Sequence, residues 1–182
     1  MKRKITVVII LIGLPILVYA SYVGLVFSRG IDYQILAAIT EDSYPMIPKR
    51  LAMAYLKYGP ISIQDKTNTE RSPLSFALAG VGIVDNDKDV YKTVEILIDR
   101  GANVNEYNEG LTPLHEAVLF GDIELIRILL SAGAVPEAVI TSNNSAKGLN
   151  AFQFAELLES KDSEKYKPIV EFMEKATDHR VK

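Results

Sequence analysis

Residues 110–134, GLTPLHEAVLFGDIELIRILLSAGA, constrain the fold more than any other stretch of this chain. Thr112 can cap a helix whose first residue, Pro113, lacks the amide hydrogen that a helix start leaves unpaired. Apolar residues then recur at helical spacing as far as Gly121, which suits the left-handed conformation that ends many helices. A second apolar stripe follows and stops before Gly133. The segment therefore predicts two short amphipathic helices, which can bury their apolar faces only against stacked neighbours. The expected core residues are Leu114, Ala117, Val118, Leu125, Ile126, Ile128 and Leu129.

The order of these residues resembles the ankyrin repeat. Its pattern centres on T-P-L-H-x-A, which is present here as Thr112, Pro113, Leu114, His115 and Ala117. The resemblance implies an all-α fold, an ankyrin-repeat solenoid of stacked helix-turn-helix units. It also implies that His115 is a structural hydrogen-bonding residue and that loop tips and inner helices form a concave face for protein partners.

The chain contains a second copy of this pattern upstream. Residues 72–77 match residues 112–117, and residues 97–102 match residues 129–134. The prolines of the first match are 40 positions apart, whereas the glycines of the second are 32 apart. The upstream copy therefore carries eight extra residues between its helices, which we place in a loop at 81–89.

Two degenerate copies flank this pair. Residues 148–155 match residues 110–117, with Asn150 as the expected cap, and the helix that follows is expected to begin near Pro168. At the other end, residues 31–39 and 45–58 are expected to form the helices of a first unit. We thus predict about four units, of which the outer two are atypical, as capping repeats usually are.

The chain begins with a segment of a different kind. After Lys2, Arg3 and Lys4, residues 5–27 contain no charged side chain. This segment is long enough for one transmembrane helix across a hydrocarbon core of ~30 Å. We favour a retained anchor at 5–27, since a cleaved signal has a shorter apolar run; cleavage near Ala20, which would release the protein to the periplasm, is the alternative.

Three regions follow from these patterns: an anchor or signal segment at 1–29, an ankyrin-repeat domain at 30–177 and a tail at 178–182. We expect residues 1–29 to contribute nothing to the repeat core. The basic residues before the apolar segment predict a cytoplasmic N-terminus, so that a single-pass inner-membrane protein would hold its repeats in the periplasm. Apart from those three residues, 17 basic and 23 acidic residues remain, which argues against a nucleic-acid partner.

The sequence offers little catalytic chemistry, and we expect no enzyme, no catalytic residue, no cofactor and no metal site. The chain has no cysteine, and no second histidine or nucleophile is placed to act with His115. Asp85, Asp87 and Asp89 are spaced like the start of a calcium loop, but that loop's glycine and final glutamate are missing. We interpret these residues as an acidic, solvated loop.

The candidate functional residues lie at three loop tips, at 66–71, 106–109 and 141–147. The insertion at 81–89 and a long connection at 160–166 are additional candidate surfaces. Phe76, Leu119 and Phe120 are expected to pack mainly in the core. The expected partner-binding residues are Asn68, Glu70, Arg71, Tyr107, Asn108, Glu109, Asn143, Asn144 and Lys147.

These features favour a membrane-tethered binding protein over an enzyme. The small single-span architecture resembles bacterial ankyrin-repeat immunity proteins, which implies a toxic effector encoded nearby, such as a lipase, as the partner. A non-inhibitory scaffold or adaptor of the envelope uses the same binding surface and is the alternative, because a repeat fold does not by itself identify a function.

Overall fold

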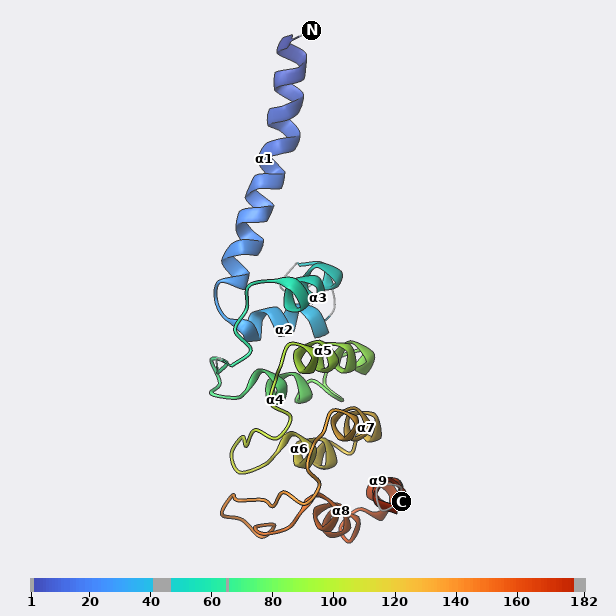
Figure 1. Ribbon diagram of the computed structural model, residues 1–182. Coiled ribbons are helices and arrows are strands. Elements are labelled where there is room, and N and C mark those ends of the chain that lie inside the picture. Colours follow the sequence, from blue (N-terminus) through green and yellow to red (C-terminus); the bar gives the residue numbers. More distant parts are fainter. Residues whose placement is uncertain (1, 41–46, 65, 179–182) are drawn as a thin grey trace.

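The repeat region is a stack of helix pairs from which one long helix extends (Figure 1). The computed structural model describes residues 2–40, 47–64 and 66–178, and the side chains of those between 12 and 176. The helices are α1 (Lys2–Phe27), α2 (Ile31–Ile39), α3 (Lys49–Tyr58), α4 (Pro73–Leu78), α5 (Asp87–Asp99), α6 (Pro113–Phe120), α7 (Ile123–Ser131), α8 (Ala151–Glu159) and α9 (Ser163–Asp178). Among the described residues, the remaining regular structure is two isolated β-bridges in the loops.

The unit formed by α6 and α7 follows the sequence prediction. Thr112 is the N-cap of α6, Pro113 is its first residue and Gly121 ends it with a φ of 79°. Gly133, just beyond α7, has a φ of 90°. All seven expected core residues are buried, and α6 packs against both α4 and α8. The core is therefore a continuous apolar layer between neighbouring units, as the all-α solenoid requires.

The second unit differs from the prediction in its insertion. Residues 79–86 link α4 to α5, so the predicted loop at 81–89 ends three residues early, and Asp87 and Asp89 belong to the first turn of α5. There, Asn86 caps the helix and acidic side chains favour the positive end of the helix dipole. The solvated-loop interpretation is wrong for Asp89, which is buried and accepts a hydrogen bond from Lys49 Nζ at 2.8 Å.

The last unit also begins its second helix earlier than predicted. The helix α9 starts at Ser163 instead of near Pro168, because Asp162 accepts a hydrogen bond from the Lys165 N–H at its start. The predicted connection at 160–166 is accordingly short, and Tyr166 is buried, with its hydroxyl donating to the Leu119 carbonyl at 2.8 Å. The predicted Asn150 cap is confirmed. Residues 179–182 of the predicted tail lie outside the described residues.

The first unit has the predicted first helix and a shorter second helix. The bounds of α2 match the prediction, whereas α3 begins at Lys49; the expected start at Pro45 lies outside the described residues. The guanidinium group of Arg100, just after α5, donates hydrogen bonds to the carbonyls of Leu56, Lys57 and Gly59 at 2.9–3.1 Å. The second unit thereby satisfies the carbonyl groups that the end of α3 leaves unpaired.

The end of α1 is part of the repeat core. Val26 and Phe27 are buried, and the ring of Phe27 lies 4.4 Å from that of Tyr55, centroid to centroid. Gln34 Nε2 donates to the Phe27 carbonyl at 2.9 Å, and Gly30 makes the turn into α2 with a φ of 136°. The expectation that residues 1–29 contribute nothing to the core is therefore wrong, because the last turn of α1 packs against the first unit.

Among the described residues, no helix alone has the length and hydropathy of a membrane span. Residues Ile12–Phe27 and Ile31–Ile39 satisfy both criteria together, as a pair bent by 114°.

The burial of Phe27 predicts how truncations behave. A chain that starts at residue 21 should unfold at nearly the temperature of the full chain, because it keeps the last turns of α1. A chain that starts at residue 30 should be less stable by about 3–5 kcal/mol, the usual cost of losing a buried aromatic side chain. Thermal and urea unfolding of the two fragments measures the difference. Equal stability would contradict the assignment of Val26 and Phe27 to the core.

Two leucines of α6 provide a matched test of the register. Leu114 is fully buried, whereas Leu119, which the sequence analysis placed in the core, is 40% exposed. Leu114→Ala should destabilise the protein by about 2–5 kcal/mol because it leaves a cavity between units. Leu119→Ala should cost roughly 1 kcal/mol or less, since little cavity forms at an exposed site. Urea denaturation measures both, and the reverse order would mean that the helix is rotated.

Candidate binding groove and the polar network beneath it

In each unit we call the first helix inner (α2, α4, α6 and α8) and the second helix outer (α3, α5, α7 and α9). Three loops connect an outer helix to the next inner one, and we call them fingers 1, 2 and 3 (residues 60–72, 101–112 and 133–150). Finger 2 turns at Glu109 and Gly110, whose φ values of 50° and 84° are those of a tight hairpin turn. A Cβ atom on Gly110 would lie 2.3 Å from the backbone nitrogen of Ser142 in finger 3. Glycine at this position therefore allows two finger backbones to touch.

The fingers are joined along their length. The Thr141 N–H donates to the Gly110 carbonyl at 2.9 Å, and the Tyr107 hydroxyl donates to the Val139 carbonyl at 3.0 Å. Asn105 donates to one backbone group of finger 3 and accepts from another. Lys66 of finger 1 pairs with Glu106 of finger 2. These contacts make the three loops one connected edge of the stack.

An open groove of about 590 Å³ lies between this edge and the inner helices of the first two units. Its floor is apolar, with side chains from α2, α4 and the link between α4 and α5. Ile83, in that link, is 81% exposed. Arg71 and Glu109 bring opposite charges to the finger side of the groove. The lining residues are Leu36, Ile39, Thr40, Thr69, Arg71, Phe76, Ala79, Gly80, Ile83, Val84 and Glu109.

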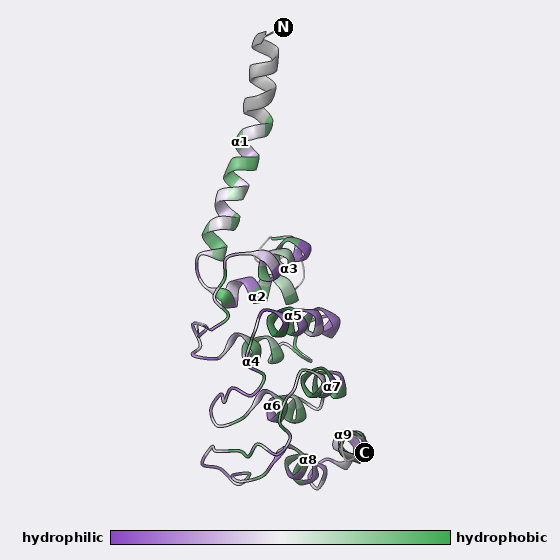
Figure 2. Cartoon of the chain, in the orientation of Figure 1, coloured by the Kyte–Doolittle hydropathy of each residue, from purple (hydrophilic) through white to green (hydrophobic). Residues whose placement is uncertain are grey.

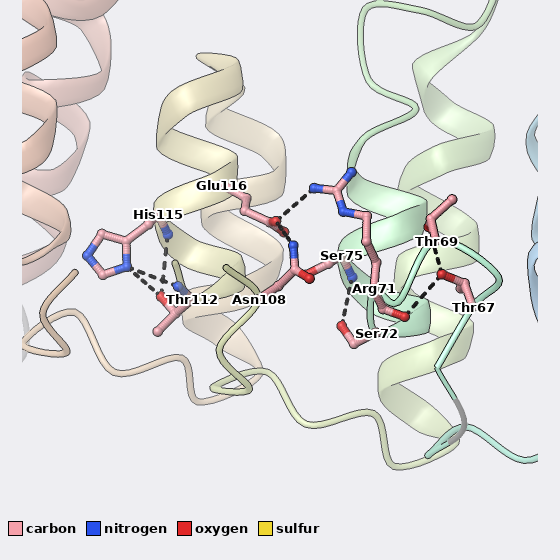
Figure 3. Close-up of polar contacts among 9 residues, drawn as sticks. All are labelled: Thr67, Thr69, Arg71, Ser72, Ser75, Asn108, Thr112, His115 and Glu116. Atoms are coloured by element: carbon pink, nitrogen blue, oxygen red, sulfur yellow. Dashed lines mark hydrogen bonds and ion pairs between the residues drawn. The ribbon is translucent and has the colours of Figure 1, made fainter. Parts of the chain in front are cut away.

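A buried carboxylate fixes the finger side of this groove (Figure 3). Glu116 of α6 is 2% exposed, and its Oε1 accepts hydrogen bonds from Arg71 Nη2 and Asn108 Nδ2, both at 3.0 Å. Arg71 comes from finger 1 and Asn108 from finger 2, so that one side chain orients two fingers. The Ser75 hydroxyl also stabilises the charged form of the carboxylate. Neither the Ser75 hydroxyl oxygen nor Glu116 Oε2 has a hydrogen bond of good geometry.

The environment of Glu116 shifts its proton affinity. Burial raises the pKa of the carboxyl group above its ordinary value, and Ser75, Arg71 and Asn108 oppose the rise by stabilising the charged form. Burial is the larger effect. The negative charge of Glu116 therefore weakens the folded state at neutral pH relative to a protonated carboxyl group.

His115, the next residue towards the N-terminus, has the structural role that the sequence predicted. Its imidazole is fully buried, and Nδ1 lies 2.7 Å from the Thr112 hydroxyl and 3.3 Å from the Thr112 backbone nitrogen, which closes a capping box on α6. Burial lowers the pKa of His115, and the Leu149 backbone opposes this shift. The ring is a neutral core residue.

The predicted residues of finger 1 have different environments. Glu70 is exposed at the turn, with a φ of 61°. Asn68 is exposed, and its Nδ2 donates to Asp32 of α2 at 2.8 Å. Arg71 is half-buried and lines the groove while it pairs with Glu116.

Finger 2 contains one correction. Asn108 is 6% exposed and belongs to the buried Glu116 network, so its side chain does not lie on the surface where the sequence analysis placed it. Glu109 is exposed and lines the groove, and Tyr107 is 42% exposed beside finger 3.

The predicted residues of finger 3 do not line the groove. Asn143, Asn144 and Lys147 are exposed, and Asn144 closes a local turn through hydrogen bonds with Ser142 Oγ and the Ala146 N–H. Sequence reasoning missed the apolar floor, since it assigned Phe76 to the core and did not single out Leu36 or Ile39. The apolar string VGIV at 81–84, inside the predicted insertion, was the signal for Ile83.

Comparison with known proteins identifies the fold family. A profile described as ankyrin repeats (3 copies) matches residues 50–144, which is more than half of the chain. The protein belongs to the ankyrin-repeat family. Its repeats make it a protein–protein interaction module, and ankyrin-repeat proteins are in general binding modules without catalytic activity. Among the described residues, no three acidic or histidine side chains come together as a metal site.

A shorter match links this ankyrin-repeat protein to a plant protein. A putative E3 ubiquitin-protein ligase of Arabidopsis thaliana, XBAT34, is 39% identical to it over 69 residues. The match covers 36% of this chain and 16% of the plant protein, so the chain spans a small part of that relative.

The raised pKa of Glu116 predicts a pH-dependent stability difference. Because the folded state holds the proton more tightly, wild type should gain stability relative to Glu116→Gln as the pH falls through the folded pKa, and the gain should be complete near the ordinary value of 4.5. Urea melts of both proteins between about pH 4.5 and 8 measure the difference in unfolding free energy. Leu119→Ala, which removes no titratable group, is the control and should show no such trend. A difference that shrinks on acidification would mean that the network favours the charged carboxylate.

Proposed function

We propose that this ankyrin-repeat protein is a membrane-tethered inhibitor that binds and neutralises a toxic envelope-active protein encoded nearby, such as a lipase. The groove of about 590 Å³ carries the proposal. Its apolar floor, beside a connected edge of fingers, suits a protein partner that inserts an apolar side chain. The resemblance to bacterial ankyrin-repeat immunity proteins supports the inhibitory role.

The N-terminal segment supports a membrane location. Residues 5–27 carry no charge and lie within the single helix α1, and three basic residues precede them. In this proposal the segment spans the inner membrane with its N-terminus in the cytoplasm, and the repeats face the periplasm. Cleavage near Ala20 would release a periplasmic protein with the same groove.

The chemistry of the groove indicates how the partner is held. The apolar side chains of its floor can receive an apolar anchor of the partner, and Arg71 and Glu109 can pair with polar groups at its rim. Because Arg71 is already oriented by Glu116, little side-chain freedom is lost on binding. Of the predicted tip residues, the proposal places Arg71 and Glu109 in direct contact, with Glu70 and Tyr107 at the periphery.

A single exposed side chain tests the groove. Ile83→Ser should weaken binding of the neighbouring gene's product about tenfold or more, because it removes an apolar contact at the centre of the interface. Ile123→Ser, at a partly exposed position of α7 outside the groove, should leave binding unchanged. Titration calorimetry measures both affinities, and thermal melts confirm that both variants stay folded.

Growth decides between the inhibitor and the alternative. Cells that lack this gene should be poisoned by siblings that deliver the neighbouring toxin, and wild type should rescue them better than Ile83→Ser. If such cells compete normally and no toxin co-purifies with the chain, the inhibitor proposal fails and an envelope scaffold replaces it.

A further inference from the structure

The outer face of α3 carries an exposed apolar stripe at the end of the stack nearest α1. Leu51, Ala54 and Tyr58 recur at helical spacing and are exposed, Tyr58 to 78%. Ala52 and Leu56, on the opposite face, are fully buried. An exposed apolar stripe on a short helix is a candidate contact surface.

Contacts on the other sides of α3 give the direction of this stripe. The helix packs against α2 and α5, Lys49 pairs with Asp89 of α5, and Arg100 donates to the carbonyls at its end. These contacts all lie towards α2 or towards the second unit. The stripe consequently faces away from α2 and α5. The helix α3 itself lies at the end of the stack from which α1 extends (Figure 1).

The depth of α3 relative to the apolar segment follows from one aromatic contact. Phe27 is the last residue of the uncharged run, and its ring lies 4.4 Å from that of Tyr55. Tyr55 is one turn from both Leu51 and Tyr58. The stripe therefore lies near the end of the apolar segment. Strongly hydrophilic residues are found in the repeats but not in the part of α1 whose side chains are described (Figure 2).

The inclination of the helices agrees with this position. The axes of Ile12–Phe27 and Ile31–Ile39 differ by 114°. With α1 along a bilayer normal, α2 would lie within about 25° of the membrane plane, and α3 packs beside it. A helix so placed presents one face to lipid along its whole length.

Cationic side chains flank the stripe on α3, and a second cation–aromatic pair joins the turn after α1 to α2. Arg50 and Lys57 flank it on α3, the Lys57 ammonium lies 5.5 Å from the ring of Tyr58, and Arg29 lies 5.7 Å from the ring of Tyr33. Tyrosine and long cationic side chains are the usual anchors of a membrane interface. Residues 5–62 contain four basic and three acidic residues, whereas residues 63–182 contain 13 basic and 20 acidic residues, so an anionic lipid surface repels the rest of the protein but not this end.

We propose that the outer face of α3 is a lipid-binding surface, and that Leu51 and Tyr58 enter the headgroup layer while Arg50 and Lys57 contact lipid phosphates. The proposal rests on the membrane anchor of the proposed function. In this proposal the first ankyrin unit contacts the membrane surface, and the binding groove begins at α2 of the same unit.

The absence of tryptophan from the chain gives a direct test. Full-length Tyr58→Trp is reconstituted in vesicles of phosphatidylcholine and phosphatidylglycerol with bromine-labelled acyl chains near the headgroup. Its fluorescence should shift to shorter wavelength and be quenched about twofold or more. Ile83→Trp, at a position of similar exposure in the groove, is the matched control and should show neither effect. Leu51→Trp repeats the test at the other end of the stripe.

Charge reversal tests the contribution of the basic residues. In the Tyr58→Trp background, Arg50→Glu with Lys57→Glu should lose most of the quenching in anionic vesicles. Lys147→Glu, in finger 3, should keep it. In vesicles of phosphatidylcholine alone, the difference between these variants should shrink, because the electrostatic attraction to the headgroups is gone.

The outcomes separate this inference from the anchor itself. If full-length protein does not float with vesicles, the anchor fails and the lipid surface fails with it. If the protein floats but the Tyr58→Trp variant is no more quenched than the Ile83→Trp variant, the anchor stands and the lipid surface is refuted. A blue shift that depends on protein concentration and occurs without lipid quenching would assign the stripe to a second copy of the chain, which also overturns the proposal.

Discussion

No helix pair of this protein can bury its apolar residues alone, and this constraint organises the molecule. Each inner helix contacts the inner helices of its neighbours, and each outer helix covers its own partner, so burial is complete only in the stack. The terminal units then need other cover. The last turn of α1, with Val26 and Phe27, supplies it at one end, and the long helix α9 packs along α8 at the other.

Polar contacts between units determine how the stack is aligned. Arg100 of the second unit caps the end of α3 in the first, and Glu116 of the third unit holds Arg71 of finger 1. Both contacts reach across a unit boundary and satisfy groups that burial would otherwise leave unpaired. They add directional contacts to an apolar layer, and the Glu116 contact holds Arg71 at the rim of the groove.

The sequence predicted the fold where local rules apply. Capping residues such as Thr112 and Asn150 and the glycines at 121 and 133 act within a few residues, and the structure confirms them. Errors arose where distant contacts decide. Asn108 looked like an exposed turn residue, but Glu116 of the next helix draws it inward; Asp89 looked solvated, but Lys49 pairs with it from 40 residues away. The groove floor combines residues from two units, and no pattern within one unit could reveal it. The partner residues and the domain boundaries stay predictions.

The contact between Phe27 and Tyr55 also affects motion. A tether of flexible residues would let a domain tumble and sample every orientation, whereas this contact restrains the repeats relative to α1. If α1 lies in a bilayer, the groove then moves mainly by rotation about the membrane normal and by lateral diffusion. The search for a partner at the same membrane is then confined to two dimensions.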